Sequence, residues 1–162
     1  MKKWLLITFC LITFIVFFNW NKTSVLEPAD LTNAYNEEWG LKLPPPNDMQ
    51  EVWAAKASIH GDGEWFNVFQ YSNYNNNFAE SGMVVLTPDT VIEAENKINH
   101  FIEATISANN NNEKIKKAFK QHPVQAQIGD SYYYDERNNG YDYFISLFKH
   151  DENKLYTLEW HQ

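Results

Sequence analysis

The chain has 162 residues, of which 44% are hydrophobic and 16% are aromatic. It therefore has enough apolar material for one folded domain and is not disordered by composition. Its formal net charge is −8, and every Asp and Glu follows an apolar N-terminal run. A field of that sign repels nucleic acid and anionic lipid, which argues against nucleic acid as a partner.

The N-terminus has the pattern of a membrane anchor. Lys2 and Lys3 precede an apolar run over residues 4–18, and Trp20 follows it. A helix over residues 4–20 would be about 25 Å long, at the short end of what crosses a bilayer. No A-x-A-like cleavage site closely follows the run, which favours an uncleaved anchor; a cleaved signal peptide is the alternative.

The charge pattern also sets the orientation of this anchor. Because the two lysines precede the run, we predict a single-pass protein with its N-terminus in the cytoplasm and its C-terminal domain outside. We divide the chain into a transmembrane helix or uncleaved signal over residues 1–20, a stalk over 21–46 and an extracytoplasmic domain over 47–162. The frequent Asn, Lys, Ile, Tyr and Phe are typical of an AT-rich, bacterial genome.

The single cysteine, Cys10, lies inside the apolar run. The rest of the chain therefore needs no disulfide framework and contains neither a thiol nucleophile nor a thiolate zinc site. We expect no cofactor and no metal site in the outer domain.

The predicted stalk contains a short helical pattern. Leu31, Tyr35 and Trp39 recur at a spacing of four, which predicts an amphipathic helix that ends at Gly40. Three prolines at residues 44–46 then favour an extended stretch.

A hairpin is predicted next, with strands over residues 52–59 and 64–71. The Asp62-Gly63 pair between them is a strong turn signal. A two-residue turn at this pair would place Ile59 opposite Phe66, with the apolar residues sorted onto one face.

Two helices and a short strand follow the hairpin. Residues 83–86 fit a short strand, and Thr87-Pro88-Asp89 has the composition of a helix start. Apolar residues then recur on one face until an asparagine run at 109–112. A second helix is predicted at about 113–121, before Pro123.

The C-terminal third predicts three strands, at about 131–136, 143–149 and 155–160, joined by turns. The middle strand is apolar on both faces, which indicates a central position. The predicted fold class is α+β: an antiparallel sheet of about five strands, made of an N-terminal hairpin and a C-terminal three-strand meander. One or two helices pack on one face of this sheet, and the N-terminal transmembrane helix precedes it.

The strands carry more large aromatic residues than one covered face of a sheet needs. We predict that the face turned away from the helices is an open binding surface for a protein, a peptide or an envelope polymer. The alternative is that residues 25–46 fold back over this face, with Tyr35 and Trp39 as its cover. The candidate binding residues are Trp65, Phe69, Tyr71, Phe144 and Phe148.

An enzymatic function is the second hypothesis. His60, Asp62 and Glu64 alternate at the hairpin tip and offer groups for general acid–base chemistry in a small cell-envelope hydrolase. Turn chemistry is the favoured explanation of these residues. The sequence contains no H-E-x-x-H, G-x-S-x-G or phosphate-binding glycine motif. We therefore assign no catalytic residues and favour a non-enzymatic, membrane-tethered binding domain with an unknown partner.

Overall fold

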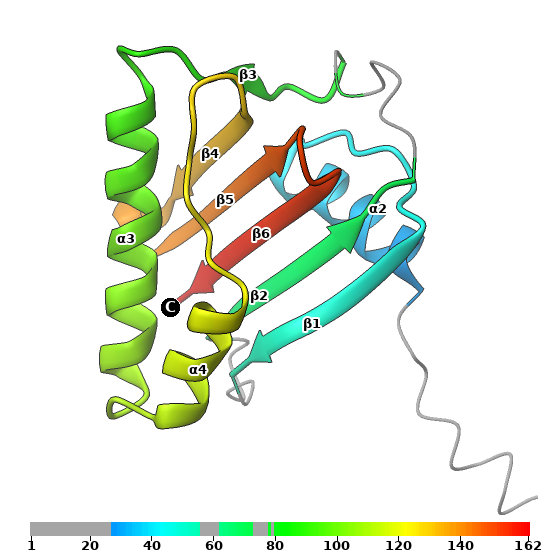
Figure 1. Ribbon diagram of the computed structural model, residues 1–162. Helices are drawn as coiled ribbons and strands as arrows, with labels where there is room; N and C mark the ends of the chain where they lie inside the picture. Colours follow the sequence, from blue (N-terminus) through cyan, green and yellow to red (C-terminus); the bar gives the residue numbers. More distant parts are fainter. Residues whose placement is uncertain (1–26, 56–61, 73–77, 79) are drawn as a thin grey trace, which may run out of the picture.

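The computed structural model describes residues 27–55, 62–72, 78 and 80–162. This part of the chain is an α+β domain with a six-stranded antiparallel sheet of order β1-β2-β6-β5-β4-β3 and three α-helices (Figure 1). The strands are β1 (Asp48–Ala54), β2 (Gly63–Gln70), β3 (Val84–Val85), β4 (Ser131–Arg137), β5 (Asp142–Lys149) and β6 (Lys154–His161). The helices are α2 (Pro28–Trp39), α3 (Val91–Ala108) and α4 (Glu113–Gln121), and a 3-10 turn, η1 (Asn138–Gly140), joins β4 to β5.

The helix predictions are confirmed in outline. Helix α2 ends at Gly40, whose φ of 71° is left-handed, a conformation that glycine adopts at little cost. Helix α3 begins at Val91, later than the Thr87-Pro88-Asp89 pattern indicates. The reason is a turn before the helix: the Thr87 amide donates to Thr90 Oγ1 (2.9 Å), and the Thr90 amide donates to the Thr87 carbonyl (3.2 Å).

The C-terminal meander is also confirmed. Strand β5 pairs with β4 on one side and with β6 on the other, so it lies inside the sheet as its two apolar faces predict. The short strand β3 pairs with β4 over two residues and forms one edge of the sheet. The sheet is one strand larger than the predicted five.

The predicted hairpin register is wrong. Gly63 belongs to β2 and pairs with His161, and the residue opposite Phe66 is Trp53 rather than Ile59. The turn at Asp62-Gly63 was inferred from composition alone, and β1 ends well before it, at Ala54. A β-bulge between Glu51 and Trp53 shifts the register, which turns Trp53 towards the α3–α4 side.

The sheet separates two hydrophobic cores. Phe66, Ile145 and Leu147 lie under α3 and α4, whereas Phe69, Phe144 and Phe148 lie on the other side. Strand alternation predicts this division, and it is confirmed. Figure 1 shows α3 and α4 on one side of the sheet and α2 behind the other.

The second core corrects the expectation that helices cover only one face. Tyr35 and Trp39 of α2 are 1% and 2% exposed and pack on the aromatic residues of that face. The Trp39 ring stacks on Phe144 at 5.5 Å between centroids, and Tyr35 contacts the same ring at 4.8 Å. Residues 28–39, which we assigned to a stalk, are therefore part of the packed domain.

The membrane anchor stays a prediction. In residues 27–162, as far as the structure describes them, no helix is long and apolar enough to cross a membrane. Residues 1–26, which contain the predicted span, lie outside the described part.

The packing of α2 predicts a large effect of Trp39→Ala. Truncating a buried tryptophan removes its packing and leaves a cavity, so we expect the free energy of unfolding to fall by about 3–5 kcal/mol. Urea unfolding of the full-length protein in mild detergent, followed by near-ultraviolet circular dichroism, measures this loss. Glu37→Ala, an exposed site in the same helix, should change it by less than about 0.5 kcal/mol. Equal stabilities for the two variants would show that α2 is not part of the core.

Candidate functional site

The structure separates the five predicted binding residues into two groups. Phe69, Tyr71, Phe144 and Phe148 are each 5% exposed or less, because α2 and Phe78 pack over them. The prediction that this face is open is therefore wrong, and the alternative in which the preceding segment covers it is the arrangement found. Trp65 is only half-buried and lines a groove.

This groove is a hollow of about 570 Å³ on the α2 side of the sheet. Helix α2 packs against β5 and β6, through contacts of Tyr35 with Phe144 and Thr157. The neighbouring strands β1 and β2 supply other parts of the lining. The groove is lined by Leu31, Glu38, Met49, Glu51, Asp62, Trp65, Asn67, Asp142, Glu159, His161 and Gln162.

A buried polar layer lies beneath α2, next to the groove. The Tyr35 hydroxyl is 3.1 Å from Thr157 Oγ1, and Asn67 Nδ2 donates to the Tyr35 oxygen (3.2 Å). Burial raises the pKa of Tyr35 above its ordinary value, with a further contribution from the Glu159 charge. The Tyr35 phenol therefore remains neutral, and its hydrogen bonds hold α2 against β2 and β6.

The most distinctive polar group of the groove is Glu159 on β6. Glu159 is 8% exposed, and its side chain lies on the α2 side of the sheet. Oε1 accepts the Trp39 indole N–H (2.8 Å) and lies 3.1 Å from His161 Nε2. A buried carboxylate is costly unless it is paired, and these two donors pair it.

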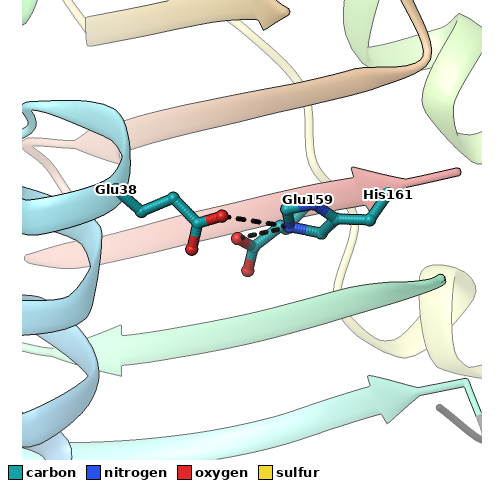
Figure 2. A group of neighbouring side chains, drawn as sticks. All are labelled: Glu38, Glu159 and His161. Atoms are coloured by element: carbon teal, nitrogen blue, oxygen red, sulfur yellow. Dashed lines mark hydrogen bonds and ion pairs between the residues drawn. The ribbon is translucent and has the colours of Figure 1, made fainter. Parts of the chain in front are cut away.

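His161 lies among carboxylates and aromatic rings at the end of β6. Figure 2 shows Glu38 of α2 directed at the same imidazole nitrogen that faces Glu159; Glu38 Oε1 is 3.9 Å from Nε2. On the other side of the ring, Nδ1 is 3.8 Å from Asp142 Oδ1. The hydrogen bond to Glu159 raises the pKa of His161 above 6.5, assisted by the charges of Glu159, Glu38 and Asp142 and opposed by partial burial.

The hairpin-tip residues are only partly described. His60 lies outside the described residues, so its grouping with Asp62 and Glu64 stays a prediction. Asp62 lines the groove and also a second hollow of about 640 Å³. Glu64 and His161 also line that second hollow, where Asn109 Nδ2 donates to Glu64 Oε2 (3.3 Å).

Sequence reasoning missed Glu38, Glu159 and His161 as a group. Glu159 and His161 interrupt a strand that is otherwise largely apolar, and their spacing of two places them on one face. This pattern in the sequence could have identified Glu159 and His161 as a candidate polar pair. Glu38 joins them only because α2 returns from 120 residues earlier in the chain, as the Trp39–Glu159 hydrogen bond records.

Comparisons with protein-family models, with curated proteins and with solved structures gave no match. The function proposed below therefore rests on the geometry and charge of the groove.

The raised pKa of His161 predicts a pH-dependent contribution to stability. Protonated His161 is favoured in the folded state, so its contribution is fully present below the ordinary pKa of about 6.5 and is lost as the pH rises through the raised value. The loss of stability caused by His161→Gln should be larger at pH 5.5 than at pH 9. Unfolding of the full-length protein with a chelator present measures both values.

Exposed His100 provides the matched control. His100→Gln should give nearly the same change in stability at both pH values. A pH-independent cost of His161→Gln would mean that the imidazole acts only through packing.

Proposed function

We propose that this chain is a non-enzymatic binding domain, tethered to the membrane by residues 4–20 and held on the outer side. Its binding site is the groove beside α2, and its partner is a cationic, partly apolar segment of a peptide or protein. The observation that carries this proposal is the charge of the groove. The lining includes the carboxylates of Glu38, Glu51, Asp62, Asp142 and Glu159.

Charge favours a basic partner over an anionic envelope polymer. Within the described lining, His161 is the one basic side chain, and Glu159 already pairs with it. The nearby Arg137 is engaged elsewhere: it lies over the Trp39 ring at 4.6 Å and pairs with Asp135 at 3.0 Å. The negative field attracts Lys and Arg side chains and raises the rate of encounter with a basic segment.

Apolar side chains between these carboxylates supply the contact area. Leu31 of α2, Met49 of β1 and Trp65 of β2 line the same groove. A half-buried tryptophan offers a large apolar face and a site for a cation above its ring. Trp65 is thus the aromatic anchor of the proposed interface, and it is the one residue of the predicted binding set that remains accessible.

The hydrolase hypothesis has less support. Asp62, Glu64 and His161 all line the second hollow. However, Glu64 accepts a hydrogen bond from Asn109 (3.3 Å), and His161 Nε2 faces Glu159 on the α2 side (3.1 Å).

The peptide proposal predicts selective binding of basic peptides. Short labelled peptides that alternate Arg and Leu should bind the full-length protein in detergent, and matched peptides with Glu in place of Arg should not. Trp65→Ala should weaken binding by about 2 kcal/mol, roughly 30-fold, because central aromatic anchors dominate such interfaces. Fluorescence anisotropy at several salt concentrations measures the affinity.

Two further variants locate the site. Glu51→Gln should weaken binding and reduce its dependence on salt, since it removes a groove carboxylate. Ile92→Ala, an exposed apolar site on α3, should leave binding unchanged. Equal binding of the Arg and Glu peptides would contradict the proposal.

The tether has its own test. The lysine pair and the absence of a nearby cleavage site predict that residues 1–20 remain in the mature protein. Intact-mass measurement of the membrane fraction should give the full-length mass. A mass that lacks the first twenty or more residues would show a cleaved signal peptide instead.

A further inference from the structure

We infer that Glu38, Glu159 and His161 form a binding site for one divalent transition-metal ion of the Zn²⁺ type. The three side chains come from two elements that α2 packing brings together, α2 and β6 (Figure 2). Their ligand atoms all lie within 4.8 Å of one another. The inference requires no peptide partner, although the three side chains also line the groove of the peptide proposal.

The two distances from His161 Nε2 are close to those of a tetrahedral ion, and the two carboxylates lie within 4.8 Å of each other. Ligand atoms about 2.0–2.1 Å from a tetrahedral Zn²⁺ lie about 3.4 Å apart. His161 Nε2 is 3.1 Å from Glu159 Oε1 and 3.9 Å from Glu38 Oε1. These two values lie on either side of the required spacing. Glu38 can make the remaining adjustment, because its side chain is 49% exposed and lies on a helix surface.

Neighbouring groups orient the other two ligands, Glu159 and His161. The Trp39 indole N–H donates to Glu159 Oε1, the proposed ligand atom, and so holds this carboxylate in place. Asp142 faces His161 Nδ1 on the side of the ring opposite the proposed ion, and the Gln162 amide donates to Asp142 Oδ1 (3.0 Å). Metal-bound histidines commonly direct their second nitrogen at a carboxylate, which orients the ring and strengthens the ligand.

The donor set indicates the class of ion. An imidazole with two carboxylates suits Zn²⁺ and related transition metals, whereas Ca²⁺ prefers six to eight oxygen ligands and Mg²⁺ keeps several waters. Three protein ligands leave at least one coordination position free for water, as in open zinc sites. This position is accessible because all three side chains line the groove.

Metal binding must displace a proton from the imidazole. Protonated His161 cannot ligate through Nε2, so at a pH where the imidazole is protonated the ion displaces the Nε2 proton, which passes to solvent. Affinity should therefore increase between pH 6 and pH 8. In the competing explanation, the three side chains form only an ion-paired cluster, which stabilises α2 against β6 without a metal.

Calorimetric titration of the untagged, full-length protein in detergent with Zn²⁺ distinguishes these explanations. We expect saturable binding of one equivalent at pH 8, with weaker binding at pH 6. His161→Gln and Glu38→Gln should each weaken Zn²⁺ binding at least about tenfold. His100→Gln, which removes an exposed histidine and keeps the groove intact, should bind like the unaltered protein.

Glu38→Gln is the decisive variant, because an exposed helix position tolerates substitution and the variant should fold. The absence of saturable binding would overturn the inference. So would a Zn²⁺ affinity of either Glu38→Gln or His161→Gln equal to that of His100→Gln. Because no peptide is present in this titration, its result is separate from that of the peptide experiment.

Discussion

A sheet that is apolar on both faces must be covered on both faces, and this constraint determines the arrangement of the whole domain. Phe144 and Phe148 of β5 point away from α3 and α4, and the same strand directs Ile145 and Leu147 towards them. Leaving the first pair in water would forfeit the free energy of burying two large rings, roughly 1.5–3 kcal/mol each. Tyr35 and Trp39 of helix α2 cover Phe144, and Phe78 covers Phe148.

The way in which α2 covers the sheet also creates the candidate site. One short helix can shield only part of a face, and α2 contacts β5, β6 and the Asn67–Phe69 part of β2. The parts of β1 and β2 next to the helix therefore line a groove that contains Trp65 and Met49. In addition, the buried indole of Trp39 needs a hydrogen-bond acceptor, and Glu159 supplies it. The carboxylates and His161 consequently lie at the rim of an aromatic core.

Much of the fold could be predicted because it depends on local patterns. The C-terminal strands, α4 and the end of α2 at Gly40 follow from alternation, helical spacing and a left-handed glycine. The hairpin register could not be predicted, because Asp-Gly is a turn signal only when the strands on both sides reach it. The bulge beside Trp53, which shifts the pairing, has no comparable signal in composition.

Part of the candidate site could also be predicted from the sequence, because that part depends on local strand patterns. Trp65 could be nominated from its strand, and Glu159 and His161 stand out in β6 as charged and titratable residues on one face. The four buried aromatics were assigned to the correct face and given the wrong exposure, because the position of α2 depends on contacts with residues distant in the chain. Glu38 joins the site through the same long-range packing.

Photo-crosslinking of a bound basic peptide tests most directly whether the groove beside α2 is the working surface. A peptide that carries a crosslinker next to its Arg side chains would be bound to the full-length protein, and the modified residues identified by mass spectrometry. The proposed function predicts crosslinks at Leu31, Met49 and Trp65. Crosslinks confined to the exposed α3 surface or to the β3 edge, at Ile92, Val84 or Val85, would contradict it.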